Sequence, residues 1–434
     1  MTAPTIPASE SVRQKQPAQQ SNQPEQPRRK HDRLITRDMA LVMLATFCFM
    51  SSNMLANPIV AGYAESLGAD GMLMGAVAGS MSFISLFCRP IAGNLSDKTS
   101  KRTLVAVGTV LYFAAGLLYY FANSPIMLIM ARVINGVGFA CCSVCLATWM
   151  SLLLPIRHMG AGMGLYGTMN ALAMAVGPAL GIRAQKYIGY RLTFLSSLVL
   201  AVIMLLATLM VKNGGQPVRK KQTSITENPS IAVDIDGSAS ATKKHRFSIR
   251  SILEPRVVPL SLTFMMFAIA YFANQSFIVS YVQSRHLPVS SDLFFMFYAV
   301  ALLVLRLGLR DLFDSKGFRF WLTVCSLGML AMLACMTFLF NDWMLLLAAI
   351  FTAVGYGLMS SVTQAQAVVI AGRERSGIAN STYYAGIDLG MSVGPFVGGL
   401  VYGRLSAVWF YPVLMLTMPV AWLIYLLCVR RVSR

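Results

Sequence analysis

Asp388 is the only carboxylate well inside an apolar stretch of this sequence, and its setting suggests reversible protonation. Removal from water disfavours the charged form of a carboxyl group, so a buried aspartate can take up and release a proton near neutral pH. Polar residues recur around it at steps of four, namely Asn380, Tyr384, Asp388 and Ser392. A helix would carry all four along one face. The alternative is that Asp388 makes a fixed hydrogen-bonded contact to another helix.

Three arginines also fall within apolar stretches, at Arg89, Arg132 and Arg306. A guanidinium group inside a membrane costs several kcal/mol unless it is paired or faces water. Arg132 is therefore a functional candidate, and the alternative is a structural pairing with a neighbouring helix.

The composition places these residues in a membrane. Hydrophobic residues make up 56% of the chain and charged residues 12%, and the mean hydropathy is +0.61. Such a chain cannot keep its surface in water as a soluble globule. Apolar runs of about 20 residues, long enough to cross a bilayer, recur between short polar loops. Because these runs are continuous rather than alternating, they predict helices and not the strands of a barrel.

The sequence predicts twelve membrane-spanning helices in two halves. The predicted cores are 40–63, 70–92, 103–122, 126–150, 160–182, 192–212, 257–282, 292–312, 320–340, 343–367, 377–402 and 408–429. Residues 1–38 are polar and are expected to be a disordered cytoplasmic tail. A cytoplasmic linker, 213–255, is expected to join six-helix bundles at 39–212 and 256–430, with 431–434 as a cytoplasmic end.

Basic residues set the predicted orientation. Of 36 lysines and arginines, five lie at one end of the predicted helices, namely Arg183, Lys186, Arg191, Arg285 and Arg404. Apart from the three arginines within helices, the remaining 28 lie at the other end, with both termini and the linker. The positive-inside rule makes that end cytoplasmic. The net charge of +19 then reflects topology and attraction to anionic lipids, and no nucleic acid is expected as a partner.

The eight cysteines all fall inside predicted helices. Cys141 and Cys145 lie one turn apart, as the ligands of a soft metal could, but small residues at helix contacts are the more economical interpretation. We expect neither disulfides nor a metal.

An internal repeat relates the two halves. At a constant offset of 217 residues, Arg89 falls on Arg306 and Asp97 falls on Asp314. The same offset joins Arg102 to Arg319, Gly160 to Gly377, Gly177-Pro178 to Gly394-Pro395, Gly181 to Gly398, and Asn57 to Asn274. Charges and Gly-Pro pairs rarely coincide by chance, so duplication of a six-helix unit is the economical explanation. Halves related in this way place a solute site at their interface in transporters.

The loop between the second and third predicted helices resembles a family signature. Residues 93–102, Gly93-Asn94-Leu95-Ser96-Asp97-Lys98-Thr99-Ser100-Lys101-Arg102, are similar to the pattern G-x-L-x-D-R/K-x-G-R-R/K of the major facilitator superfamily, with Ser100 replacing a glycine. The resemblance implies a gating role for Gly93, Asp97, Lys98, Lys101, Arg102, Asp314 and Arg319. Asp97 would face the helix start near Gly377 and stabilise an outward-open state, with Asp314 near Gly160 as its counterpart. The alternative is that these charges only set topology.

Two further stretches resemble the twelve-helix drug/proton antiporter group of that superfamily. Residues 128–140 around Arg132 are similar to the group's helix 4 pattern, which implies a role of Arg132 in proton coupling. A Gly-Pro motif of the antiporters resembles Gly177, Pro178 and Gly181, and again Gly390, Gly394, Pro395 and Gly398. The first copy lacks the glycines that the pattern has at 173 and 182. These residues are candidate bending and sealing surfaces.

We hypothesise that Asp388 carries the driving proton and that Arg132 modulates it electrostatically. Many antiporters of this group have an acidic residue in helix 1, where this chain has Asn53 and Asn57. The resemblance places the solute between helices 1, 4, 7 and 10, with Asn53, Asn57, Tyr271, Asn274, Gln275 and Tyr384 as candidate contacts. Buried amides need partners, so they either bind solute or bridge helices.

The resemblance implies an all-α membrane protein with the major facilitator fold, in which twelve helices form two pseudo-symmetric six-helix bundles. We expect a monomeric secondary transporter of the cell membrane, not an enzyme, with a small amphipathic solute, protons and lipids as partners. Its energy source would be the proton gradient, with no cofactor. Proton-coupled efflux by antiport is favoured, and the alternative is a proton-coupled importer of a sugar, amino acid or organic acid. A receptor or integral enzyme is disfavoured, because no nucleotide-binding loop, redox motif or histidine cluster appears.

Overall fold

The computed structural model describes residues 36–154, 159–212, 215, 254–309, 312, 316–372 and 376–429. These residues belong to the unit Ile35–Arg434. All regular structure within the described ranges is helical, as the predicted all-α class requires. Nearly all of the predicted tail and linker, and the predicted end 431–434, lie outside the described residues.

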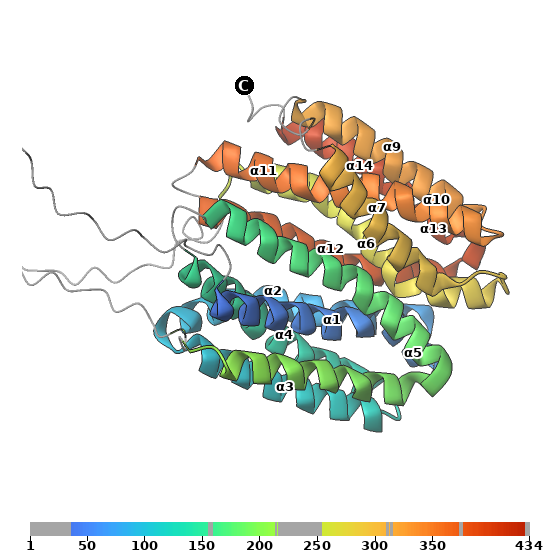
Figure 1. The fold of residues 1–434 in the computed structure, drawn as a ribbon. Coiled ribbons are helices and arrows are strands. Elements are labelled where there is room, and N and C mark those ends of the chain that lie inside the picture. Colours follow the sequence, from blue (N-terminus) through green and yellow to red (C-terminus); the bar gives the residue numbers. More distant parts are fainter. Residues whose placement is uncertain are drawn as a thin grey trace, which may run out of the picture. The chain divides into compact units, whose positions relative to one another are not determined.

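The described residues of the first half form five helices (Figure 1). They are α1 (Arg37–Ser66), α2 (Gly71–Lys98), α3 (Lys101–Phe121), α4 (Pro125–Leu153) and α5 (Met159–Leu209). Side-chain oxygens cap helix starts, because the first N–H groups of a helix lack intrahelical acceptors. The Asp70 carboxylate accepts a hydrogen bond from Leu73 N at 2.8 Å, and the Ser124 hydroxyl accepts one from Met127 N at 3.4 Å.

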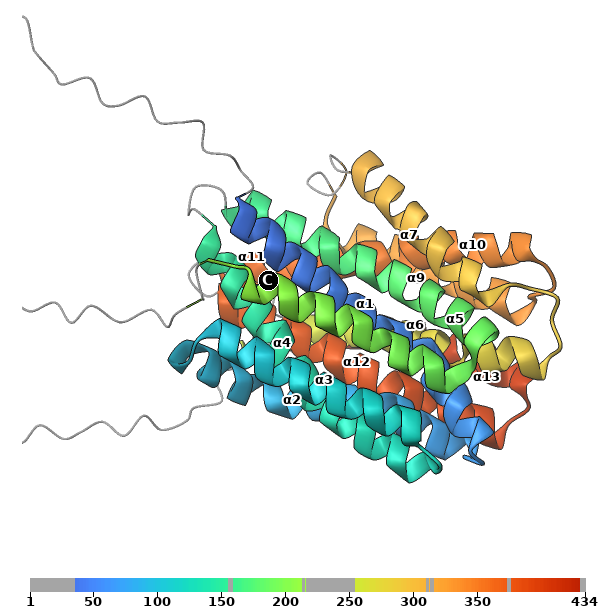
Figure 2. The ribbon, with the colours of Figure 1, turned by 60° about the horizontal axis from the view of Figure 1, so that its bottom comes forward.

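The second half is divided more finely. It contains α6 (Val258–Ser284), α7 (Ser291–Gly308), α9 (Phe318–Thr337), α10 (Asp342–Thr352), η3 (Ala353–Leu358), α11 (Met359–Ala371), α12 (Ser376–Arg404), η5 (Ala407–Trp409), α13 (Phe410–Leu414), α14 (Thr417–Ile424) and η6 (Tyr425–Val429). The π-helical η3 joins α10 and α11 into one span, 342–371. Figure 2 gives a second view, and in both views α12 runs beside helices of the first half.

Within the described ranges, ten helical segments are long and apolar enough to cross a membrane. One of them, Leu165–Leu209, has 45 residues, and as a straight helix it would measure about 68 Å, twice the hydrocarbon thickness. Gly189 divides it into two passes, since its φ of 74° and ψ of 174° are accessible to glycine and not helical. With α7, which has 18 residues and is not among the ten, the described residues account for twelve crossings. The predicted break between 182 and 192 is thus a turn at one glycine rather than a loop.

Close glycine contacts join α5 to α1 and, by the same design, α12 to α6. A Cβ added to Gly177 would lie 2.9 Å from the Ser51 carbonyl oxygen, and one added to Gly394 would lie 2.7 Å from the Ile269 carbonyl oxygen. Both distances are shorter than side chains tolerate, so the helices approach backbone to backbone. Gly177 and Gly394 are related by the offset of 217, so the repeat extends from sequence to packing.

Candidate functional site

The two halves meet along α2 and α12 through five glycines, which we call the glycine seam. They are Gly71, Gly75 and Gly79 on α2, at steps of four, and Gly399 and Gly403 on α12. A Cβ added to Gly75 would lie 2.5 Å from the Pro395 carbonyl oxygen and 3.0 Å from Gly399 Cα. Larger residues would force the helices apart, so the seam holds the halves together at the helix ends near Gly71.

Arg89 and Asp388 form an ion pair across the same two helices, beyond the glycine seam. Arg89 Nη2 donates to Asp388 Oδ1 at 2.9 Å, and Arg89 Nε lies against Asp388 Oδ2. The Asp388 side chain is 2% exposed and the Arg89 side chain is 24% exposed. Arg89 follows the start of α2 by 18 residues, which is about 27 Å along the helix. The pair therefore lies within the spans, nearer the helix end at Lys98 than the end at Gly71.

A buried ion pair of this kind depends on the charge of both partners. Removing one charge leaves the other buried and uncompensated, which is strongly unfavourable. Protonation of Asp388 would cancel the attraction to Arg89 at the point where the two halves meet. The arrangement can therefore link a proton to the separation of α2 from α12.

Aromatic side chains surround the ion pair. The Arg89 guanidinium carbon lies 5.6 Å from the ring centroid of Phe139 on α4, a cation–π distance. Phe139 stacks in turn on Phe49 of α1, with ring centroids 5.4 Å apart. Tyr384, one turn before Asp388, and Tyr166 on α5 are close enough to Arg89 to interact with it electrostatically. Tyr384 is 43% exposed, so the cluster is accessible on this side.

The four polar residues at steps of four on α12 have different environments. Asn380 accepts a hydrogen bond from Gln364 Nε2 of α11 at 3.2 Å. Ser392 is buried in the glycine seam, where its carbonyl oxygen lies against Gly79. Only Asp388 among the four has a charged partner within the described residues. The common helical face is as expected, but its members do not form one site.

Arg132 is held inside the first half. Its two terminal nitrogens donate to Asn57 Oδ1, at 3.2 Å each, and Nη2 also donates to Ala78 O at 2.6 Å. Arg132 Nε donates to Val77 O at 3.3 Å, so the 2%-exposed side chain joins α4 to α1 and α2.

Arg132, which was expected to modulate Asp388 electrostatically, is bonded elsewhere, and the charged partner of Asp388 is Arg89. Arg132 lies seven residues into α4, about 10 Å from the helix end on the Gly71 side. Asp388 is 16 residues from the end of α12 on that side, or about 24 Å. The two residues are therefore at different depths in the membrane, which sequence patterns alone do not resolve.

Three of the predicted solute contacts pack against neighbouring helices. Asn57 holds Arg132, and its repeat counterpart Asn274 accepts a hydrogen bond from the Tyr411 hydroxyl at 2.9 Å. Tyr271 is fully buried and stacks on Tyr356 of η3, with centroids 4.0 Å apart and planes at 1°. These contacts bridge neighbouring helices within one half. Bridging helices was the alternative to binding solute for the buried amides.

Two other predicted contacts are Asn53 on α1 and Gln275 on α6. Asn53 is buried, and neither atom of its amide group has a hydrogen-bond partner in the described part of the chain. Gln275 Nε2 reaches across to Met54 Sδ at 3.9 Å. A buried amide without partners is costly, so Asn53 retains the capacity to bind a polar group.

The predicted gating residues lie at the end of α2 and the start of α3 and α9. Helix α2 runs through Gly93 to Lys98, and Lys98 and Arg319 are exposed. Lys101 N donates to Gly215 O at 3.0 Å, and Arg102 Nη2 donates to Val211 O. These two residues thus attach the loop to the chain that follows α5. Asp314, the side chain of Asp97 and the surroundings of Gly160 and Gly377 lie outside the described residues.

The family follows from comparison with known proteins. The profile described as Major Facilitator Superfamily matches residues 42–342 and 317–434, which is most of the chain. The chain belongs to the major facilitator superfamily. It is therefore a transporter of the major facilitator type rather than an enzyme, and a multi-pass membrane protein.

Relatives of this major facilitator transporter come from distant organisms. An uncharacterised MFS-type transporter of Methanocaldococcus jannaschii is 22% identical over 381 residues, covering 86% of this chain and 92% of that protein. An SPX domain-containing membrane protein of Arabidopsis thaliana is 32% identical over 169 residues. That match spans 38% of this chain and only 24% of the plant protein.

Solved structures share the major facilitator fold at low identity. A POT family transporter in complex with a thioalcohol-conjugated peptide has a TM-score of 0.71 and 12% identity, covering 92% of this chain and 97% of that one. A nucleoside transporter has a TM-score of 0.71 and 13% identity, covering 90% and 99%. These likenesses establish the fold of twelve helices in two bundles.

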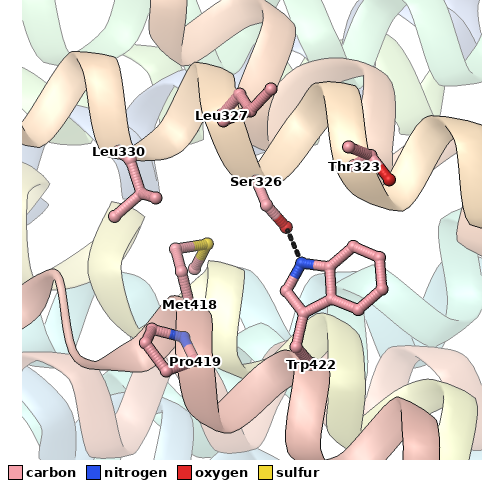
Figure 3. A pocket seen from close by; sticks show the side chains of 7 residues that line it. All are labelled: Thr323, Ser326, Leu327, Leu330, Met418, Pro419 and Trp422. Carbon is pink, nitrogen blue, oxygen red and sulfur yellow. Dashed lines mark hydrogen bonds between the residues drawn. The ribbon is translucent and has the colours of Figure 1, made fainter.

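An apolar pocket of about 320 Å³ lies apart from the ion pair, between α9 and α14 (Figure 3). Its lining comprises Thr323, Ser326, Leu327, Leu330, Met418, Pro419 and Trp422. Trp422 Nε1 donates to Ser326 Oγ at 3.1 Å across one wall. Leu327 is largely exposed, so this pocket opens on the lipid-facing side of one half.

Sequence reasoning missed two features of the major facilitator interface. The first is Arg89 as the partner of Asp388, 299 residues away in the chain. Its position inside an apolar stretch was the available signal. The second is the glycine seam, which the four-residue spacing of Gly71, Gly75 and Gly79 could have indicated.

Proposed function

We propose that this transporter couples movement of a small amphipathic solute to the proton gradient, with Asp388 as the proton carrier and Arg89 as its basic partner. The observation that carries the proposal is the ion pair between α2 and α12, across the interface of the two halves. Alternating access requires that interface to open and close around the solute. If Asp388 holds this interface closed only as the charged carboxylate, the opening of the interface depends on protonation of Asp388.

The groups around Asp388 support reversible rather than permanent protonation. Arg89 from α2 favours the carboxylate, whereas burial favours the neutral acid. The Tyr384 hydroxyl on α12 interacts electrostatically with both Asp388 and Arg89, and the Tyr166 hydroxyl on α5 interacts with Arg89. Asp388 thus has two states, distinguished by whether Arg89 is paired.

Export by antiport is the direction we propose first. The Gly-Pro residues that resemble the antiporter motif lie at backbone contacts, with Gly177 against α1 and Gly394 against α6. We further propose that the termini are cytoplasmic and that the membrane is the cell membrane, because basic residues concentrate at that end of the predicted helices. With this orientation the glycine seam closes the extracellular side.

Import with protons is a second candidate, and one observation favours it. Protonation of Asp388 leaves Arg89 without its partner, and Arg89 is 24% exposed. A guanidinium released in this way would attract an anionic group of the solute, so that proton and solute bind together. Coupled binding of this kind produces symport.

Everted membrane vesicles test both directions. Everted vesicles that respire on lactate acidify inside. They are prepared from cells that express the wild type, Asp388→Asn or Glu65→Gln, and a panel of solutes is added to each. If the transporter is an antiporter, adding a transported solute should release protons from vesicles with the wild type. Vesicles with Glu65→Gln, the control at an exposed position, should do the same, and vesicles with Asp388→Asn should release none. If Asp388→Asn, inserted in the same amount as the wild type, still couples transport to proton movement, the proposal is contradicted. Uptake into intact cells driven by an inward proton gradient would instead establish symport.

A further inference from the structure

Arg306 is the third arginine within the predicted spans, and no described residue gives it an acidic partner like that of Arg89. It corresponds to Arg89 at the offset of 217, but the position corresponding to Asp388 is Ala171. Among the described residues, Arg306 makes no hydrogen bond or ion pair, and its Nε atom is buried. The repeat has therefore placed the same cation on α7, but not the anion that Arg89 meets on α12.

The face of α7 that carries Arg306 is turned toward the protein. Phe295, Leu302 and Arg306 follow at steps of seven and four, which keeps them on one side of a helix. Phe295 and Leu302 are buried, whereas Val300 and Val304 on the opposite side are largely exposed. Arg306 therefore shares the packed face of α7 rather than the face that meets lipid.

Tyrosines lie near Arg306. The hydroxyls of Tyr298 on α7 and Tyr356 in η3 are close enough to interact electrostatically with it. The Tyr383 hydroxyl on α12 is also within electrostatic range, but it already donates to Ser360 O at 2.9 Å. Tyr356 belongs to the π-helical segment η3, and such irregular turns occur frequently at functional sites. Tyr384 interacts electrostatically with both Tyr356 and Arg89, so hydroxyl groups connect the two arginines.

The charge balance of the spans identifies what could bind there. Arg132 is satisfied by an amide and carbonyl oxygens, and Arg89 by Asp388. Arg306 is half-buried, and no acidic group among the described residues compensates its charge, which is unfavourable within a membrane unless the group meets water or a ligand. An arginine with tyrosine hydroxyls around it offers several hydrogen-bond donors to one acceptor group.

We propose that Arg306, with Tyr298 and Tyr356, binds the oxyanion of the transported solute, so that the solute is a small anion with a carboxylate, phosphate or sulfonate group. The proposal rests on the proposed transport function but not on its direction or on the proton. An organic anion and inorganic phosphate share the recognised chemistry, and the experiment separates them. A competing role is contact with lipid headgroups, because Arg306 lies two residues before the end of α7.

The test is the thermal unfolding of the purified full-length protein with a set of small probes. The anions are benzoate, phenyl phosphate, benzenesulfonate and inorganic phosphate, and the size-matched controls are benzamide and benzylamine. A ligand that binds the folded protein raises the unfolding temperature. The variants are Arg306→Gln, Arg306→Lys and Arg404→Gln, the last removing one exposed arginine from the same half.

We expect at least one anion, and neither control compound, to stabilise the wild type and Arg404→Gln. Loss of charge-assisted hydrogen bonds in Arg306→Gln should weaken that binding on the order of tenfold or more. Arg306→Lys, which keeps the charge, should restore part of the affinity and shows that the site has folded. Stabilisation by inorganic phosphate alone would identify the free ion as ligand, and stabilisation by the phenyl compounds would identify an organic anion.

Two results overturn the proposal. One is that no anion stabilises the wild type, and the other is that Arg306→Gln binds the anions as well as Arg404→Gln does, as a headgroup contact predicts. The experiments also distinguish failure of this anion site from failure of the proposed proton coupling. Anion binding that depends on Arg306 with no proton movement would remove the coupling and keep this site. Proton-coupled transport of benzylamine, unchanged in Arg306→Gln, would remove this site and keep the coupling.

Discussion

The first half of the chain supplies two arginines within the spans, one buried and one half-buried, that are stabilised in opposite ways. Arg132 is held by neutral acceptors of its own half, the Asn57 amide and two carbonyl oxygens. Arg89 is held by the Asp388 carboxylate of the other half. Neutral acceptors keep their hydrogen bonds at any physiological pH, whereas a carboxylate loses its charge when it is protonated. The contrast distinguishes a fixed structural contact from one that can be switched.

The largest expected effect is the loss of stability on replacing Arg132. Arg132→Gln removes a cation with four hydrogen bonds and leaves Asn57, Val77 and Ala78 without their donor. We expect destabilisation of about 3 kcal/mol or more, measured as thermal unfolding in detergent. Arg256→Gln, at an exposed position, is the matched control. If both variants unfold at the wild-type temperature, the Arg132 contacts do not stabilise the first half.

The next effect concerns the ion pair, and a double-mutant cycle measures it. Arg89→Gln and Asp388→Asn each leave one buried group unpaired, whereas the double variant leaves none. We expect the single changes to destabilise the protein and the double variant to recover about 1 to 3 kcal/mol. The coupling energy should fall as the pH is lowered, because the carboxyl group becomes protonated and loses its attraction to Arg89. Strictly additive changes at neutral pH would contradict a direct interaction.

A smaller effect is expected at the glycine seam. Gly75→Ala adds a Cβ that would meet Pro395 O and Gly399 Cα, so the closed arrangement of α2 and α12 becomes less stable. We expect transport to fall several-fold, which corresponds to about 1 kcal/mol. A single cysteine placed at Ser392, in a variant without the native cysteines, should react faster with a thiol reagent when Gly75 is replaced. Gly308→Ala is the control, since a Cβ there meets no atom within 4 Å. Equal labelling rates in the two variants would count against the seam as a closing contact.

The smallest effect tests the structural role of Asn274. Tyr411→Phe removes the hydroxyl that donates to Asn274 Oδ1, and its expected cost in stability is about 1 kcal/mol. The Michaelis constant for a transported solute should not change, because this contact lies within the second half. A large rise in that constant, with stability unaltered, would place Asn274 at the solute after all.

Sequence patterns predicted the helices and the charge in the spans better than the partners. Long apolar runs and the offset of 217 are local or periodic properties, so the twelve crossings and the burial of Asp388 follow from them. The pairing of Asp388 with Arg89 joins residues 299 positions apart and depends on how two bundles dock, which no pattern in one helix encodes. Arg132 was the expected partner, but its depth in α4 places it near Asn57.

The solute contacts were predicted least well for a related reason. Polar residue type identifies groups that need a partner but does not say whether the partner is protein or solute. Asn57 and Asn274 found partners in their own halves, whereas Asn53 has none among the described residues. The sequence identifies Arg306 as an arginine within an apolar stretch and as the repeat of Arg89. Its different environment becomes visible once Ala171, and not an acid, is found at the corresponding place.

The turn at Gly189 has a consequence for how the chain enters the membrane. With the termini cytoplasmic, as proposed, this one-residue turn between the passes of α5 must reach the far side together with Arg183, Lys186 and Arg191. Basic residues resist translocation, and the turn is too tight for either pass to insert alone. The two passes should therefore insert together as a helical hairpin during biosynthesis. Arg191 Nη2 donates to Asn123 Oδ1 at 2.8 Å, and this hydrogen bond links the inserted hairpin to the turn between α3 and α4.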